Sequence, residues 1–154
     1  MIMLKEGIKA PNFTSTNQFG EEVKLSDYLG YNVVLYFYSK DMTSGCTKEA
    51  TAFRDLYPFF KEKDTVIIGV SKDTTISHKK FMDKYSLPFI LLSDPELEVI
   101  KMYDVLGEKN MYGKKVIGVI RSTYIINKEG TIQKAFTKVK AEENPKEVLD
   151  CLCL

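Results

Sequence analysis

Cys46 is the residue of this chain whose surroundings are best suited to chemistry. It follows an apolar, strand-like run over residues 33–38 and a polar loop over residues 39–45, and a segment with helical periodicity comes directly after it. The free N–H groups and the dipole at the start of a helix stabilise a thiolate, the form of cysteine that attacks electrophiles. The pattern therefore predicts a nucleophilic thiol in a strand–loop–helix unit.

An inert, buried thiol is the alternative interpretation of Cys46, because free cysteine is among the most buried residue types. At about 100° per residue, Cys46 shares one face of the expected helix with apolar residues, namely Ala50, Phe53, Tyr57 and Phe60. Burial raises the pKa of a thiol, so a reactive Cys46 needs a positive group beside it. Thr43 and Gly45, just before the helix, are typical of a turn that stabilises an anion and favour the reactive interpretation.

Strands and helices alternate along the chain, which predicts an α/β protein. Strands are expected at residues 33–38, 65–71 and 89–92, and in a hairpin of residues 119–126 and 131–137. Helices are expected at residues 47–63, 74–85, 95–103 and 145–152, the third with Asp94 as N-cap and Pro95 as its first residue. This order is that of a thioredoxin-like fold, a central mixed sheet flanked by helices, with an N-terminal extension. Residues 1–154 should form a single domain.

The composition argues against several classes of partner and location. The chain has 22 basic and 21 acidic residues and a formal net charge of +1, with no basic stripe for nucleic acid. No apolar run approaches the ~20 residues that span a bilayer, and residues 1–6 are too short and polar for a signal peptide. We therefore expect a cytoplasmic protein with neither nucleic-acid nor membrane partners.

The cysteines and the single histidine do not form a recognisable framework. Cys46, Cys151 and Cys153 are odd in number and widely separated, which fits neither a disulfide scaffold nor a zinc site. His78 lies in a lysine-rich helical stretch, and we interpret it as a solvated surface residue. No metal and no organic cofactor are expected.

Three stretches carry a resemblance to a known family. Residues 39–55, SKDMTSGCTKEATAFRD, resemble the active-site segment of peroxiredoxins, whose signature is P-x-x-x-T-x-x-C, with Thr43 and Cys46 at the threonine and cysteine positions. The residues around Cys46 are most similar to those of the bacterioferritin-comigratory, or Q-type, subfamily. The stretch GIKAPNFTSTNQFGEEVKLSDYLG resembles the N-terminal segment of the family, and GVIRSTYIINKEGTI resembles its hairpin, with Arg121 at the catalytic arginine position.

The resemblance implies a thiol-dependent peroxidase that reduces hydrogen peroxide and organic hydroperoxides. Cys46 would attack a peroxide oxygen and become a sulfenic acid. Arg121 would stabilise the thiolate and the leaving oxygen, and Thr43 would hydrogen-bond the thiolate or the peroxide. The alternatives are a surface ion pair for Arg121 and a helix N-cap for Thr43. Glu49 could be a partner for an arginine, but we expect it to be an exposed helix residue.

This chain departs from the family pattern in ways that leave the reduction of the sulfenic acid open. Ser39 stands where the signature has proline, so the pocket is either looser or gains a hydrogen bond, and Ser44 replaces a second proline. Thr51 stands where many members carry a resolving cysteine. Either an external thiol reduces Cys46 in a one-cysteine cycle, or Cys151 or Cys153 does so; a functionally neutral C-terminus is the further alternative for these two.

The resemblance also suggests thioredoxin or a small thiol as reductant and a monomer or weak homodimer. Two other functions are compatible with a reactive cysteine. A thioredoxin-like disulfide oxidoreductase needs Cys-x-x-Cys, and Glu49 occupies the position of the second cysteine. A cysteine-based redox sensor would be oxidised without turning over peroxide.

Overall fold

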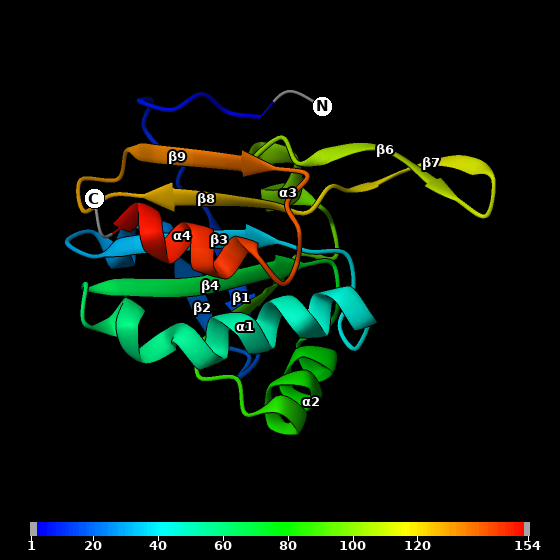
Figure 1. The fold of residues 1–154 in the computed structure, drawn as a ribbon, viewed down its shortest axis with the longest axis horizontal. Helices are drawn as coiled ribbons and strands as arrows, with labels where there is room; N and C mark the ends of the chain where they lie inside the picture. The colour runs from blue at the N-terminus through cyan, green and yellow to red at the C-terminus, as the bar shows by residue number, and fades with distance from the viewer. Residues whose placement is uncertain (1–2, 153–154) are drawn as a thin grey trace.

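The computed structural model describes residues 3–152, and its main feature is a seven-stranded mixed sheet in the order β2-β1-β5-β4-β3-β8-β9 (Figure 1). The strands are β1 (Thr14–Asn17), β2 (Glu22–Lys24), β3 (Asn32–Phe37), β4 (Thr65–Ser71), β5 (Ile90–Ser93), β8 (Ser122–Ile126) and β9 (Ile132–Thr137). β4 pairs in parallel with β3 and β5, whereas the other neighbours in this sheet are antiparallel. The thioredoxin-like arrangement predicted from the sequence is confirmed, and β1 and β2 extend it at one edge.

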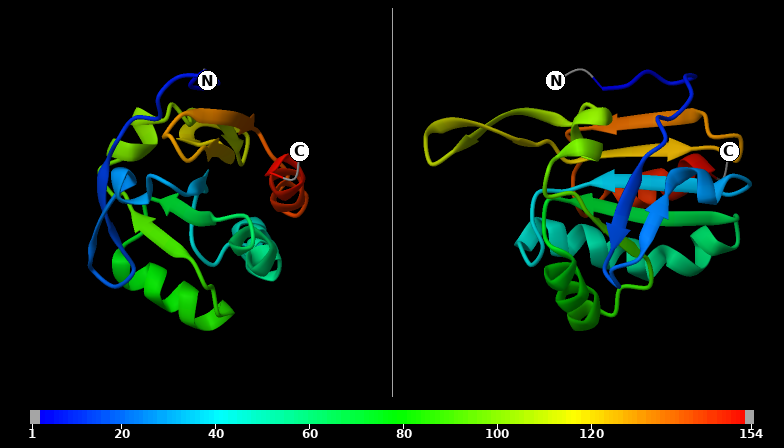
Figure 2. Two further views of the ribbon diagram at one scale, coloured as in Figure 1. Left: turned by 90° about the vertical axis from the view of Figure 1, so that its left-hand side faces the viewer. Right: turned by 180° about the vertical axis from the view of Figure 1, so that it is seen from behind.

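Helices cover both faces of this sheet (Figures 1 and 2). The elements outside the sheet are η1 (Leu25–Tyr28), α1 (Ser44–Lys61), α2 (Thr75–Tyr85), α3 (Glu98–Met102) and α4 (Asn144–Leu152). Side chains of β3 alternate between two hydrophobic clusters, as the period of two in a strand requires. Leu35 lies in the cluster with η1 and α3, and Tyr36 lies in the cluster with α1, α2 and α4. None of the helices within residues 3–152 is long and apolar enough to cross a membrane.

The predicted start of the third helix, at residue 95, was wrong. α3 begins only at Glu98, while Pro95 lies in a turn and Leu97 adopts a left-handed conformation with φ 60°. Asp94 still stabilises this helix, because its carboxylate accepts hydrogen bonds from the N–H groups of Glu98 at 2.9 Å and Ile100 at 2.8 Å. Leu97, and not Asp94, is therefore the N-cap of α3, although the Asp94 carboxylate still accepts from N–H groups of its first turn.

A second hairpin, β6 (Leu106–Met111) and β7 (Lys114–Val119), was not predicted and projects beyond the main sheet (Figures 1 and 2). Its turn consists of Tyr112 and Gly113, both with positive φ, which matches a two-residue type I′ turn. The predicted strand at residues 119–126 is consequently divided: Val119 ends β7, and β8 begins at Ser122. The connection between the two hairpins holds Arg121.

Candidate active site

Cys46 lies in the first turn of α1, because this helix begins at Ser44 and not at residue 47 as predicted. β3 ends at Phe37, a loop follows, and α1 begins at Ser44, so the sheet and the helix hold the thiol between them. The side chain of Cys46 is only 1% exposed and packs in the cluster beneath α1, together with Ala50 and Phe53. The inward orientation deduced from helical periodicity is thus confirmed.

The Arg121 guanidinium lies directly beside this thiol. Arg121 Nη2 donates to Cys46 Sγ at 3.4 Å, across 75 residues of sequence. Gly45 makes room for this contact, because a Cβ at that position would lie 3.1 Å from Arg121 Nη2. Antiparallel pairing of β8 with β3 brings the segment after β7 to the loop that precedes α1. The fold therefore holds Arg121 beside the thiol, and Arg121 is not an isolated surface cation.

The surroundings of Cys46 lower its pKa below the usual value of a thiol. Burial raises this pKa, but the Thr43 hydroxyl, the Lys40 main chain, the Arg121 charge and the Ser39 hydroxyl each lower it. Ser39 Oγ lies 3.6 Å from Cys46 Sγ, so the serine in place of the family proline adds a hydrogen bond. A buried thiolate stabilised in this way can attack a small electrophile from a site that largely excludes water.

Thr43 occupies the N-cap position of α1, but its hydroxyl is directed elsewhere. Thr43 Oγ1 donates to the Lys40 carbonyl at 2.8 Å, which closes the turn before the helix. Because a hydroxyl has one hydrogen and two lone pairs, the oxygen of Thr43 can still accept a hydrogen bond from a bound molecule. Thr43 thus lies at the site beside Cys46, as the sequence predicted.

Glu49 is buried, so the expectation of an exposed helix residue was wrong. Its side chain is fully inaccessible, and Oε1 accepts a hydrogen bond from Arg121 Nη1 at 2.6 Å. A spacing of three residues places Glu49 on the same face of α1 as Cys46, because residues three and four apart are neighbours on a helix. The guanidinium therefore bridges the buried carboxyl group and the sulfur, which fixes its orientation.

Burial raises the pKa of Glu49 from 4.5 to about 8, although the Arg121 charge lowers it. A proton that the folded state retains and the unfolded chain loses makes folding less favourable as the pH rises. We therefore predict that Glu49→Gln, which keeps an acceptor for Arg121 but does not titrate, gains stability relative to the native chain between about pH 5 and about pH 8. Urea unfolding of both proteins across this range measures the difference, and a difference that stays constant with pH would contradict the prediction.

Among the described residues, no disulfide joins Cys46 to the candidate resolving residue Cys151. Thr51 lies within α1 and donates to the Thr47 carbonyl at 2.9 Å. Cys151 is a free, half-buried thiol near the end of α4, which lies alongside α1 with its C-terminal end away from the start of α1 (Figure 1). Cys153 lies outside the described residues.

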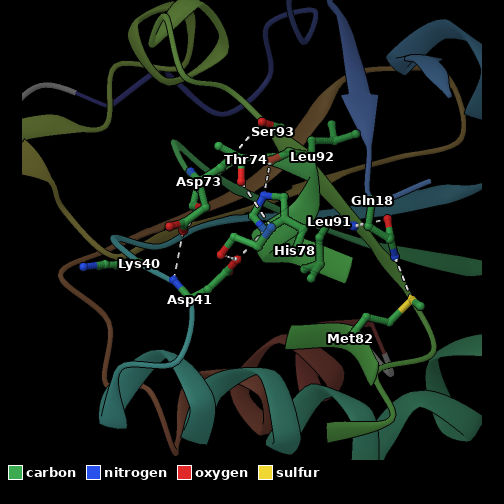
Figure 3. A network of polar contacts seen from close by, with 12 residues as sticks. Gln18, Lys40, Asp41, Asp73, Thr74, His78, Met82, Leu91, Leu92 and Ser93 are labelled. Carbon is green, nitrogen blue, oxygen red and sulfur yellow. Dashed lines mark hydrogen bonds and ion pairs between the residues drawn. The ribbon is translucent and has the colours of Figure 1, made fainter. Parts of the chain in front are cut away.

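His78 is fully buried, so its interpretation as a solvated surface residue was wrong. Its Nδ1 lies 2.8 Å from Asp41 Oδ2 and its Nε2 lies 2.9 Å from the Leu92 carbonyl (Figure 3). The spacing of His78 to Phe81, three residues on the apolar face of α2, was the signal that could have revealed its burial. Asp41, His78 and Asp73 offer ligand atoms within 4.8 Å of one another. Hydrogen bonds within the protein already engage these atoms.

A cavity of about 330 Å³ adjoins the loop that precedes α1. Ser39, Lys40 and Thr43 line one side of it, and the unpredicted hairpin supplies an apolar wall of Leu106, Met111, Val116, Ile117 and Val119. Lys72 and Lys109 add positive charge. Burial lowers the pKa of Lys109, as do the charges of Arg121 and Lys72, whereas Cys46 raises it. The cavity is thus an apolar recess with a cationic border, next to the loop that precedes Cys46.

The matches to a family model, to curated relatives and to solved structures agree with one another. Residues 7–135 match the model of the AhpC/TSA family. The chain is 49% identical to the peroxiredoxin Bcp of Bacillus subtilis, over 98% of this chain and 96% of that protein. A cysteine mutant of Xylella fastidiosa PrxQ superposes with a TM-score of 0.93 at 34% identity, covering 99% of this chain and 98% of that one. The Xanthomonas campestris bacterioferritin comigratory protein, solved to explain its alkyl peroxide reduction activity, superposes with a TM-score of 0.90 at 35% identity, covering 97% and 98%.

Proposed function

Because the chain belongs to the AhpC/TSA family and is a peroxiredoxin, a thiol peroxidase of the Bcp or Q type, we propose that Cys46 is its attacking residue. Thr43 and Arg121 complete the proposed catalytic site. The observation that carries this assignment is the position of Arg121, whose Nη2 lies 3.4 Å from Cys46 Sγ while Nη1 is held by buried Glu49.

The proposed reaction is an in-line displacement on the peroxide. The Cys46 thiolate forms an S–O bond with one oxygen, the O–O bond breaks, and the electron pair leaves with the other oxygen, which takes up a proton to become water or an alcohol. Cys46 is left as a sulfenic acid. Arg121 stabilises the charge that develops on the leaving oxygen, and the free lone pairs of Thr43 accept the O–H of the incoming hydroperoxide.

Hydrogen peroxide and organic hydroperoxides are the proposed substrates. The cavity beside Ser39 and Thr43 supports the organic class, because its wall of hairpin residues is apolar. An alkyl group placed there leaves water while its peroxide group points toward the thiol, and burial of apolar surface is favourable. Hydrogen peroxide needs only the polar groups around Cys46.

An external thiol, thioredoxin or a small thiol, is the proposed reductant. Thr51 replaces the usual resolving cysteine, and the sequence has no cysteine between Cys46 and Cys151. The C-terminal end of α4, the helix that holds Cys151, lies away from the start of α1. These observations favour a one-cysteine cycle. We further propose that residues 1–154 act as a single domain, as a monomer or weak homodimer, in the cytoplasm, where reducing conditions keep such thiols available.

The oxidation product of one turnover tests this assignment. After one equivalent of peroxide without reductant, we predict a sulfenic acid on Cys46 that a dimedone probe traps, both in the native chain and in Cys151→Ser/Cys153→Ser. Mass spectrometry of the peptides and a non-reducing disulfide map measure the result. A disulfide between Cys46 and the C-terminal segment in the native chain would contradict the one-cysteine cycle, and a sulfenic acid confined to another cysteine would contradict the site.

A further inference from the structure

Asp41 lies in the middle of the loop between β3 and α1, yet its side chain is nearly inaccessible. Three polar groups converge on its carboxyl group. Tyr38 Oη donates to Oδ1 at 2.6 Å, Ser77 Oγ donates to Oδ2 at 2.8 Å, and His78 Nδ1 lies 2.8 Å from Oδ2. Figure 3 shows Asp41 and His78 facing each other, with Leu92 on the far side of the imidazole.

The partners of His78 determine where its protons are. The Leu92 carbonyl can only accept, so Nε2 carries a hydrogen. Asp41 accepts from two hydroxyl groups, and His78 Nδ1 makes the remaining close contact with its Oδ2. His78 therefore joins the Asp41 carboxyl group of the loop to the Leu92 carbonyl of β5. A buried polar pair whose hydrogen bonds are satisfied favours one arrangement of the groups that carry it.

The loop that this pair holds supplies groups that act on the sulfur. Ser39, Lys40 and Thr43, all within two residues of Asp41, each act on the Cys46 thiol. The Asp41 N–H also donates to Asp73 Oδ2 at 2.9 Å. Met42, the next residue, has φ 67°, a backbone conformation that persists only where its surroundings fix it. The loop is therefore strained beside the site and anchored from α2 and β5.

We propose that Asp41 and His78 form a positioning pair, which anchors the loop so that Ser39, Lys40 and Thr43 face Cys46. The pair acts through the loop and contacts neither the sulfur nor the peroxide. This inference rests on the proposed role of Cys46. It adds that the geometry around Cys46 depends on the contact between Asp41 and His78.

Two amide variants, His78→Asn and His78→Gln, distinguish the contact of the imidazole with Asp41 from its contact with Leu92. The side-chain nitrogen of Asn occupies the position of Nδ1, so His78→Asn retains a donor to Asp41. That of Gln occupies the position of Nε2, so His78→Gln retains the donor to Leu92 and loses the one to Asp41. We expect kcat/KM for hydrogen peroxide to fall by about tenfold or more in His78→Gln and by less than about threefold in His78→Asn, with the KM for the reductant unchanged in both.

Urea unfolding shows whether the two variants are equally destabilised, and Phe60→Leu, a core substitution toward the far end of α1, controls for stability alone. Asp41→Ala, which removes the same contact from the loop side, should reproduce the loss and replaces His78→Gln if that variant does not fold. Equal peroxide kinetics in His78→Asn and His78→Gln, or full activity of Asp41→Ala, would overturn the positioning role. Cys46→Ser in the same series keeps the outcomes distinct, because retained turnover there would overturn the proposed function itself.

Discussion

Replacement of Cys46 by serine is expected to abolish thiol-dependent peroxide reduction, lowering turnover by at least about 10³-fold. A serine hydroxyl is not ionised near neutral pH, so the groups that lower the pKa of the thiol have no thiolate to stabilise. Removal of a catalytic nucleophile typically leaves only the small effect of binding and polar stabilisation. Because serine is nearly isosteric with cysteine, the buried packing beneath α1 should be retained.

Consumption of hydrogen peroxide with a thiol reductant in excess measures this effect. Cys151→Ser is the matched control, since it also removes one thiol but should keep nearly full turnover. Turnover that survives Cys46→Ser would show that another residue attacks. Absence of turnover in the native chain, with Cys46 still oxidised, would favour the redox sensor over the peroxidase.

The sequence was sufficient for the parts of the site that depend on local pattern. The presence of a helix after the loop, the inward direction of Cys46 and the central position of β3 follow from apolar periodicity. Thr43 and Arg121 could be named from the resemblance, and the fold then brings both to the thiol. The predictions for α1, Cys46 and β3 succeeded because each depends on a segment whose neighbours in sequence are also its neighbours in the structure. Arg121 lies 75 residues from Cys46, so only the resemblance could name it.

Glu49 and His78 were misjudged because their partners are distant in the sequence. Glu49 was assigned to the surface from its residue type, since isolated charged groups are rarely buried, and His78 was assigned there from the lysine-rich stretch around it. Arg121, 72 residues away, makes burial of Glu49 tolerable, and Asp41, 37 residues away, does so for His78. A polar residue on the apolar face of a helix indicates a buried partner, but the pattern does not identify that partner.

The hairpin of β6 and β7 escaped prediction for a different reason. β6 is rich in charged and polar residues, and most of its side chains, like those of β7, are exposed or half-buried. Its turn begins with Tyr112 at φ 53°, a conformation that aromatic residues seldom adopt. The cavity beside Cys46 depends on this hairpin for its apolar wall, so it could not be foreseen either.

Substitution of Arg121 by glutamine is expected to lower kcat/KM for hydrogen peroxide by about 10²–10³-fold at neutral pH. Glutamine removes both the positive charge next to Sγ and a donor for the leaving oxygen. The pKa of Cys46 should also rise, because the Arg121 charge is one of the causes that lower it. Stopped-flow measurement of peroxide consumption across the pH range, together with the ultraviolet absorbance of the thiolate, follows both effects.

The pH profile separates these two roles of Arg121. In the native chain the lowered pKa of Cys46 lets the thiolate form at a lower pH than an ordinary thiol requires, so the rate reaches its plateau at a lower pH. The profile of Arg121→Gln should move to higher pH, because its thiol needs a higher pH to ionise. If thiolate formation were the only role, the rate at high pH would recover completely. Because Arg121 also stabilises the leaving oxygen, we expect a plateau that stays below that of the native chain.

Because Arg121 has a buried partner, Glu49, this experiment also needs variants in which residue 49 does not titrate. Arg121→Gln leaves Glu49 buried beside a neutral amide, which by itself could disturb α1. In Arg121→Gln/Glu49→Gln both groups are neutral, and Glu49→Gln alone is its reference, since that variant keeps a guanidinium held by an amide oxygen. Arg121→Lys retains the charge but not the planar fork that bridges the carboxyl group and the sulfur. Native-like rates in Arg121→Lys would mean that charge alone suffices, whereas a loss close to that of Arg121→Gln would assign the effect to the two-sided geometry of the guanidinium.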